Sequence, residues 1–291
     1  MRVKDILLCC DHKKGLSPED FEDAFTPLSD IEREGRMRFA IADGATESSF
    51  SKEWAQLLVK KFRSSGFSVF DKDVLAELAT EWGKGTNQSN LSWYNQEKVS
   101  LGSYAALLGF EADLTSGECK ATAVGDCCMM LLRGGMLLFS FPIESADGFS
   151  NRPLLIGTKD GIPTDGKKEA RGSLQEGDML VFASDALAAW ILGAKDNRGI
   201  ADLFLDVMSD ERRVKEKNAI MGNFEKISKV YENEFSHNHD YFSRLALEGS
   251  VTADQVKRWR FRNLIFRDLI ARERDNSRLK NDDVTLCVIQ F

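Results

Sequence analysis

The stretch FAIADGATE, residues 39–47, decides the fold because an apolar strand runs directly into an acidic residue and a glycine. This junction places the carboxylate of Asp43 at a strand end, beside a glycine whose backbone a ligand can approach closely. The arrangement recurs in LVFASD, residues 180–185, and in NDDVTLCVI, residues 281–289, where the acidic residues precede the strand. Acidic strand ends so far apart in sequence predict one oxygen-lined metal site assembled across a sheet.

The composition is that of an ordinary globular protein. The chain has 291 residues, of which 43% are hydrophobic and 29% charged, and this length permits a sizeable core. No apolar run reaches the roughly 20 residues that span a bilayer, and residues 1–10 are interpreted as a first strand rather than a signal peptide. The six cysteines are irregularly spaced without a C-x-x-C pair, which indicates a reducing compartment. We therefore expect a cytoplasmic protein without a membrane partner.

Charge is unevenly distributed along the chain, whose net charge is −7. Residues 195–280 carry 18 basic and 15 acidic residues, or +3, and the remainder carries 21 and 31, or −10. An acidic protein is a poor general binder of nucleic acid, so we expect no nucleic-acid partner. The acidic excess lies in the part of the chain that holds the candidate metal ligands.

Hydrophobic periodicity predicts a single mixed domain over residues 1–291, with a charged, mostly helical insertion at about 195–280. Residues 252–255, TADQ, have the form of a capping box and predict a helix to about Arg272. Residues 103–141 predict a meander of short antiparallel strands, and residues 145–171 are loop-rich. The remaining predictions are strands at 3–9, 36–42, 178–184 and 283–290, and helices at 48–63, 72–82, 91–100 and 186–193.

Taken in order, the acidic motifs resemble those of the metal-dependent serine/threonine protein phosphatases of type 2C, and in particular a compact bacterial-like branch. The matching segments are FEDAF at 21–25, DG at 43–44, LGSYA at 101–105, AVGD at 123–126, ASDA at 183–186 and DDVT at 282–285. Each motif alone is weak, but the ordered set covers nearly the whole chain. The resemblance implies an α+β fold in which two packed antiparallel sheets are flanked by helices.

The resemblance also implies a binuclear centre of two Mg²⁺ or Mn²⁺ ions. Asp43 would bridge the two metals and Gly44 would offer its carbonyl, while Asp185 and Asp282 would hold one metal and Glu22 or Asp23 the other. Asp126 and Asp283 are weaker candidates. Hard cations take such oxygen ligands, and clustered carboxylates without metals would raise one another's pKa.

The implied reaction is hydrolysis of phosphoserine or phosphothreonine in a phosphorylated protein, by direct attack of a metal-bridging hydroxide. Asp43, Asp185 and Asp282 would be the catalytic residues. The implied partners are the phosphorylated substrate protein and a cognate Ser/Thr kinase.

Some family positions differ here, and they keep a second function open. Pro18 stands where the phosphate-binding arginine is expected, and only Lys13 and Lys14 are nearby. Ala45 replaces the histidine that many members carry after Asp-Gly, and Ala189 replaces an acidic residue. The substrate-binding residues are therefore unassigned. The alternative is a catalytically weak or inactive pseudophosphatase that acts as a signalling or binding module.

A third hypothesis concerns CCMMLLR, residues 127–133, which satisfies the Cys-x5-Arg spacing of cysteine-based phosphatases. A phosphate-binding loop of that kind favours small residues, whereas this spacer is large and apolar and predicts a buried strand. The preceding Asp126 would also raise the thiol pKa of Cys127 rather than lower it. The sequence therefore disfavours a cysteine nucleophile.

Overall fold

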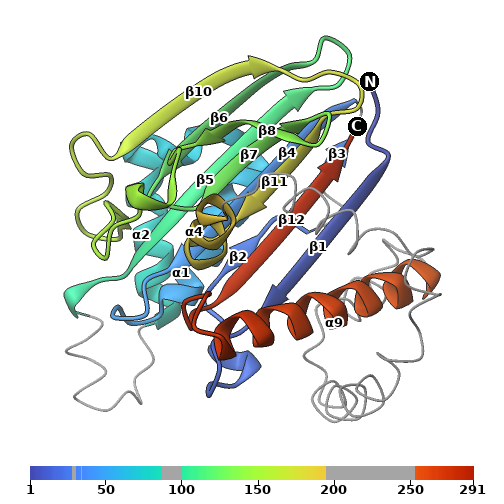
Figure 1. Ribbon diagram of the computed structural model, residues 1–291. Coiled ribbons are helices and arrows are strands. Elements are labelled where there is room, and N and C mark those ends of the chain that lie inside the picture. The colour runs from blue at the N-terminus through green and yellow to red at the C-terminus, as the bar shows by residue number, and fades with distance from the viewer. Residues whose placement is uncertain (28–30, 34, 87–99, 195–252) are drawn as a thin grey trace.

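The computed structural model describes residues 1–27, 31–33, 35–86, 100–194 and 253–291. Two antiparallel sheets pack face to face, and helices cover their outer sides (Figure 1). This four-layer arrangement confirms the α+β class that the motifs predicted. Among the described residues, no helix is both long and apolar enough to cross a membrane.

The first sheet has five strands in the order β1-β12-β11-β7-β8. Its strands are β1 (Asp5–Asp11), β7 (Cys128–Arg133), β8 (Met136–Phe141), β11 (Met179–Ala183) and β12 (Val284–Gln290). The two ends of the described chain meet here, because Asp5 pairs with Gln290 in the β1–β12 register. Strand β12, which lies between β1 and β11, is buried on both faces, which explains why its sequence is mostly apolar rather than alternating.

The second sheet has seven strands, with β10-β6-β5-β4-β2 as its main order; β3 pairs with β4 and β9 with β5. Its strands are β2 (Ala24–Phe25), β3 (Glu32–Arg33), β4 (Arg36–Gly44), β5 (Tyr104–Asp113), β6 (Glu118–Val124), β9 (Ile156–Gly157) and β10 (Lys167–Ser173). The FAIADG stretch, residues 39–44, is the end of β4, which lies between β5 and β2 in this sheet.

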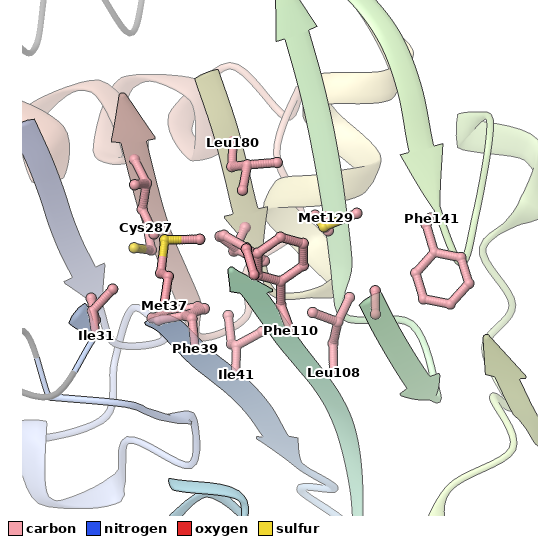
Figure 2. Packing of buried hydrophobic residues seen from close by; sticks show 14 of the residues in the cluster. Ile31, Met37, Phe39, Ile41, Leu108, Phe110, Met129, Phe141, Leu180 and Cys287 are labelled. Atoms are coloured by element: carbon pink, nitrogen blue, oxygen red, sulfur yellow. The ribbon is translucent and has the colours of Figure 1, made fainter. Parts of the chain in front are cut away.

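The core between the sheets is built from the inward side chains of both. The Phe182 ring lies 4.7 Å from that of Phe39 and 5.5 Å from that of Phe110, centroid to centroid. Figure 2 shows Phe39 and Phe110 of the second sheet facing Leu180 and Cys287 of the first. Interlocked aromatic rings of this kind fix the distance between the sheets.

Two pairs of helices complete the layers. Helices α4 (Asp185–Gly193) and α9 (Ala253–Asp275) lie over the first sheet and α1 (Ser51–Ser65) over the second, with α2 (Lys72–Thr86) packed against α1 (Figure 1). Helix α1 can pack this closely on β5 only because residue 109 is glycine. A Cβ at Gly109 would lie 2.2 Å from the ring of Phe62 in α1. Within the described ranges, the short 3-10 helices η1 (Pro18–Asp20), η3 (Gly66–Phe70) and η4 (Ala146–Gly148) join these elements.

Two expectations need correction. Residues 103–141 form four strands, but not one meander, because β5 and β6 lie in the second sheet and β7 and β8 in the first. The turn at Gly125–Asp126 is therefore a crossover between the sheets. Residues 145–166 are loop-rich as expected, apart from the short elements at 146–148 and 156–157, but residues 167–171 already belong to β10, which pairs along all of β6.

The helix expected to run to about Arg272 is confirmed in α9, which ends at Asp275. Residues 91–99 of another expected helix lie outside the described residues. The same holds for residues 195–252 of the charged insertion.

Candidate metal centre

The acidic residues singled out in the sequence lie at one end of the sandwich. Asp43 is next to last in β4, and the pairing of Ala24 with Ala42 brings Asp23 alongside it. Asp185 begins α4 directly after β11, and Asp283 immediately precedes β12, the neighbour of β11. Asp126 lies in the crossover between β6 and β7. The sheet order thus gathers carboxylates from distant parts of the sequence.

Asp23 is the most enclosed of these carboxylates, with only 4% of its surface exposed. Its Oδ2 accepts a 2.7 Å hydrogen bond from the hydroxyl of Thr285, whereas its Oδ1 has no hydrogen-bond partner among the described residues. Burial raises the pKa of Asp23 well above its ordinary value, and the nearby charge of Asp283 raises it further. Asp23 therefore presents one buried oxygen without a partner.

Asp43 is surrounded by other carboxylates. Burial raises its pKa well above the ordinary value, and Asp23, Asp185, Asp126 and then Asp282 add to the increase. Such mutual repulsion is what a cation placed among these groups would relieve. The neighbouring Gly44 is fixed by close packing, because a Cβ there would lie 2.8 Å from the backbone carbon of Ser51 at the start of α1.

Asp283 organises the backbone around the site. Its Oδ1 accepts a 2.8 Å hydrogen bond from the backbone N–H of Lys13, and its Oδ2 accepts one of 2.7 Å from that of Glu22. The Glu22 carboxylate in turn accepts a hydrogen bond from the Ser51 hydroxyl. Burial raises the pKa of Glu22 although the hydroxyls of Ser51 and Thr46 act in the opposite direction. Both oxygens of Asp283 are thus engaged with the loops that carry Lys13 and Glu22.

Two lysines pair with the remaining carboxylates. The Lys280 ammonium lies 2.6 Å from Asp282 Oδ2 and 3.4 Å from Asp185 Oδ2. The Lys13 ammonium lies 3.7 Å from Asp282 Oδ1. These contacts give the acidic cluster partial charge compensation and place positive charge at its rim.

Asp126 is buried, with 6% of its surface exposed. Burial, followed by the charge of Asp185, raises its pKa to about 7. The Asp126 carboxyl therefore belongs electrostatically to the same cluster.

Helix α9 anchors the loops at this end of the sandwich. The guanidinium of Arg274 donates to the backbone carbonyl of Asp282 at 2.5 Å and to that of His12 at 3.2 Å. It also pairs with the buried Asp11 at 2.6 Å, as does Arg267. The position of Asp282 is therefore fixed from the outer helical layer.

The residues fit a centre for hard cations in their chemistry. They offer carboxylate oxygens, one of them buried and unpaired, and a glycine at the strand end. Among the described residues, no three His, Cys, Asp or Glu side chains already stand in an arrangement that would hold a metal ion. Asp185 and Asp282 instead form ion pairs with Lys280. Binding a metal at these carboxylates would require the two side chains to turn away from the lysine.

The cysteine hypothesis is not supported. Cys127 is 1% exposed, and burial followed by the charge of Asp43 raises its thiol pKa well above the ordinary value. Arg133 pairs with Asp178 through two hydrogen bonds of 2.6 and 2.8 Å at the opposite end of β7. A thiol so disfavoured as thiolate, without the arginine beside it, is a poor nucleophile.

Sequence reasoning missed Lys280 and the hydroxyl residues of the site. Lys280 stands only two residues before Asp282, but nothing in the sequence distinguishes it from the other surface lysines. Ser51 lies within the helix expected at 48–63, and Thr285 belongs to the DDVT motif and to the strand expected at 283–290, but neither hydroxyl was given a role. Their contacts with Glu22 and Asp23 arise only when distant elements pack together.

Comparison with known proteins places this geometry in context. No protein-family model matches the sequence, and no curated protein matches it either. Among solved structures, the photosystem II phosphatase PBCP matches with a TM-score of 0.52 and 18% identity, over 99% of this chain and 98% of that one. A variant of a bacterial serine phosphatase matches with a TM-score of 0.50 and 11% identity, over 98% of this chain and 96% of that one. The chain therefore has the fold of the type 2C protein phosphatases, as its ordered motifs predicted.

Proposed function

We propose that the chain is a metal-dependent phosphatase that hydrolyses phosphoserine or phosphothreonine in protein substrates. The observation that carries this proposal is the gathering of Asp23, Asp43, Asp185 and Asp282 at one end of a sandwich with a phosphatase fold. Carboxylates gathered this closely are costly to a folded protein when, as here, positive charge compensates only some of them. Their cost is understandable if cations bind among them.

We assign the residues that would hold two Mg²⁺ or Mn²⁺ ions from the donor set. Asp43 lies among the other carboxylates and is the candidate shared ligand, with the Gly44 carbonyl beside it. Asp185 and Asp282 form one side of the centre, and Glu22 with Asp23 the other. When bound, such ions supply Lewis-acid polarisation of phosphoryl oxygens and an acidified water nucleophile.

The chain's own residues would position and bind the substrate. Asp283, with both oxygens on backbone N–H groups, holds the segment that carries Glu22 and is a positioning residue in this proposal. Lys13 and Lys280 stand at the rim of the carboxylates, and we assign them to binding the phosphoryl oxygens in place of the missing arginine. A lysine acts there as a point charge without the bidentate fork of arginine.

The decisive experiment is hydrolysis of a phosphothreonine peptide with Mn²⁺ or Mg²⁺, with excess chelator, and with Asp185→Asn. The matched control is Asp73→Asn, the same chemical change at an exposed position in the first turn of α2. We expect metal-dependent turnover that Asp185→Asn lowers by at least about a hundredfold and that Asp73→Asn leaves unchanged. Equal activity of the two variants would refute the assignment.

The pseudophosphatase alternative makes the opposite prediction. Protein that binds Mn²⁺ in calorimetry but turns over none of several phosphopeptides would be a binding module built on the same fold. The absence of a guanidinium fork at Pro18 is the feature that favours this outcome.

A further inference from the structure

A groove of about 950 Å³ lies on the outer face of the second sheet, away from the carboxylates. Its lining includes the basic residues Arg36, Arg38, Arg63, Lys120 and Arg171. Arg36 begins β4 and Asp43 lies near the other end of the same strand. Seven residues of extended chain separate the groove from the candidate metal centre by about 23 Å.

A cross-strand row of side chains carries the positive charge. The register pairs Arg38 of β4 with Glu111 of β5, Glu111 with Lys120 of β6, and Lys120 with Arg171 of β10. Arg38 forms an ion pair with Glu111 at 2.7 Å. Lys120 and Arg171 stand directly opposite each other, an arrangement of like charges that destabilises an antiparallel pair.

Arg171 has the least compensated charge in this row. Its side chain is exposed and forms no ion pair or hydrogen bond within the described part of the chain. Lys120 is held in place from two sides: its ammonium lies 4.4 Å from the centre of the Phe67 ring and 3.5 Å from Glu169. The groove thus presents two adjacent cations, one fixed and one free to meet a ligand.

The acidic residues of the groove do not cancel its charge. Three carboxylates, those of Glu111, Asp113 and Glu118, line it against the five basic side chains. Glu111 is already paired with Arg38 in an ion pair. The Asp113 carboxylate accepts hydrogen bonds of 2.7 and 3.0 Å from the backbone N–H groups of Thr115 and Ser116. A net positive groove on a protein of net charge −7 will attract negatively charged partners selectively.

We propose that this groove is a docking site for an extended acidic peptide segment of a partner protein. Its volume of about 950 Å³ is far more than a single inorganic anion fills. The spaced cations along the sheet match carboxylates carried on successive residues of an extended chain, and Phe67 offers an apolar contact for their methylene groups. This proposal does not depend on the phosphatase activity, because the groove and the metal centre are separate.

The test uses fluorescence anisotropy with a labelled peptide of about ten residues, rich in glutamate, at about 25 mM salt, where screening is weak. Full-length protein is measured with chelator present, so that no metal-dependent turnover enters the result. We compare Arg171→Glu and Lys120→Glu with the control Lys84→Glu, which makes the same charge change at an exposed site on α2. A peptide with glutamine in place of glutamate tests the need for charge.

We expect Arg171→Glu and Lys120→Glu to weaken binding about tenfold each and Lys84→Glu to change it less than twofold. Equal weakening by all three variants would show general charge attraction and overturn the proposal. So would equal binding of the glutamine peptide.

Folding is controlled separately. Arg171→Glu places opposite charges across β6 and β10, so its melting temperature should equal or exceed that of the parent. Arg171→Gln, which adds no new charge, should also weaken the peptide. Unchanged binding by Arg171→Gln would contradict a role for this side chain.

Discussion

Lys280 and Asp282 form an ion pair of 2.6 Å, and the same ammonium lies 3.4 Å from Asp185. One exposed lysine thus bridges two carboxylates that the motifs assign to a metal. Burial lowers the pKa of Lys280, but the hydrogen bond to Asp282 and the charges of Asp185 and Asp282 together outweigh it, so the pKa lies above its ordinary value. The lysine therefore remains charged and competes with cations for these oxygens.

The first prediction follows from this competition. Lys280→Gln should bind Mn²⁺ up to about fivefold more tightly in calorimetry, because an exposed ion pair worth roughly 0.2–1 kcal/mol no longer opposes the metal. The same variant should raise KM for a phosphopeptide if Lys280 binds the phosphoryl group. Lys84→Gln serves as control for both measurements. Weaker Mn²⁺ binding by Lys280→Gln would contradict the competition.

The second prediction concerns the hydrogen bond between Thr285 and Asp23. Thr285→Val keeps the shape of the side chain but removes the donor to a buried carboxylate, which should lower the free energy of unfolding by about 1–3 kcal/mol. Urea unfolding in the presence of chelator measures the difference without any contribution from metals.

Thr122→Val is a matched control for that experiment. Thr122 is also 0% exposed, but its hydroxyl has no hydrogen-bond partner within the described structure. Removing an unpaired hydroxyl should be neutral or slightly stabilising. Similar losses from Thr285→Val and Thr122→Val would show that the bond to Asp23 contributes nothing specific.

The third prediction concerns glycine at the end of β4. Gly44→Ala should destabilise the fold by about 1–3 kcal/mol, because a Cβ there would overlap the backbone of Ser51 and push the start of α1 outward. Gly83→Ala is the contrasting change, since nothing lies within 4 Å of a Cβ at that position in α2. It should stabilise the helix by about 0.5–1 kcal/mol. Thermal unfolding of both variants measures the two opposite effects, and a Gly44→Ala protein as stable as the parent would contradict the steric cost at this position.

The fourth prediction is a pH dependence remote from the site. Burial raises the pKa of Asp178, but hydrogen bonds from Arg133 and from the backbone N–H of Gln175 outweigh it, so the pKa lies below its ordinary value. A lowered folded pKa contributes stability that is present above the unfolded value of about 3.9 and is lost as pH falls through the folded value.

Arg133→Met tests this pair. At pH 7 the variant should be less stable by about 2–4 kcal/mol, because a carboxylate that is 1% exposed loses its partner. The difference from the parent should shrink as the pH is lowered toward 3, since Asp178 becomes protonated in the variant first. Carboxylates elsewhere titrate alike in both proteins and cancel. A difference that stays constant with pH would exclude the ion pair as its cause.

The sequence by itself determined the main elements and the order of the motifs. The ends of β4, β11 and β12 are predicted within two residues, because continuous apolar runs bounded by acidic or glycine residues are local signals. It did not determine how β6 and β7 are distributed between the sheets. A Gly-Asp turn at 125–126 has the same local chemistry in a hairpin as in a crossover. The two are distinguished by the long-range pairing of β6 with β5 and β10 and of β7 with β8 and β11.

For the candidate metal centre too, the sequence indicated some features and the tertiary structure decided others. The residue types at Asp43, Asp185 and Asp282 indicated an oxygen-ligand centre, and their roles as ligands stay a prediction. The contacts that bring the acidic residues together are tertiary. Thr285 donates to Asp23, Lys280 reaches Asp185, and Asp283 accepts hydrogen bonds from the backbone N–H groups of Lys13 and Glu22. Local backbone sterics and the periodic spacing of apolar residues involve only a few neighbouring positions, so their consequences can be predicted from the sequence. Hydrogen bonds and ion pairs between segments 95 to 270 positions apart depend on sheet order and register, which only the folded structure decides.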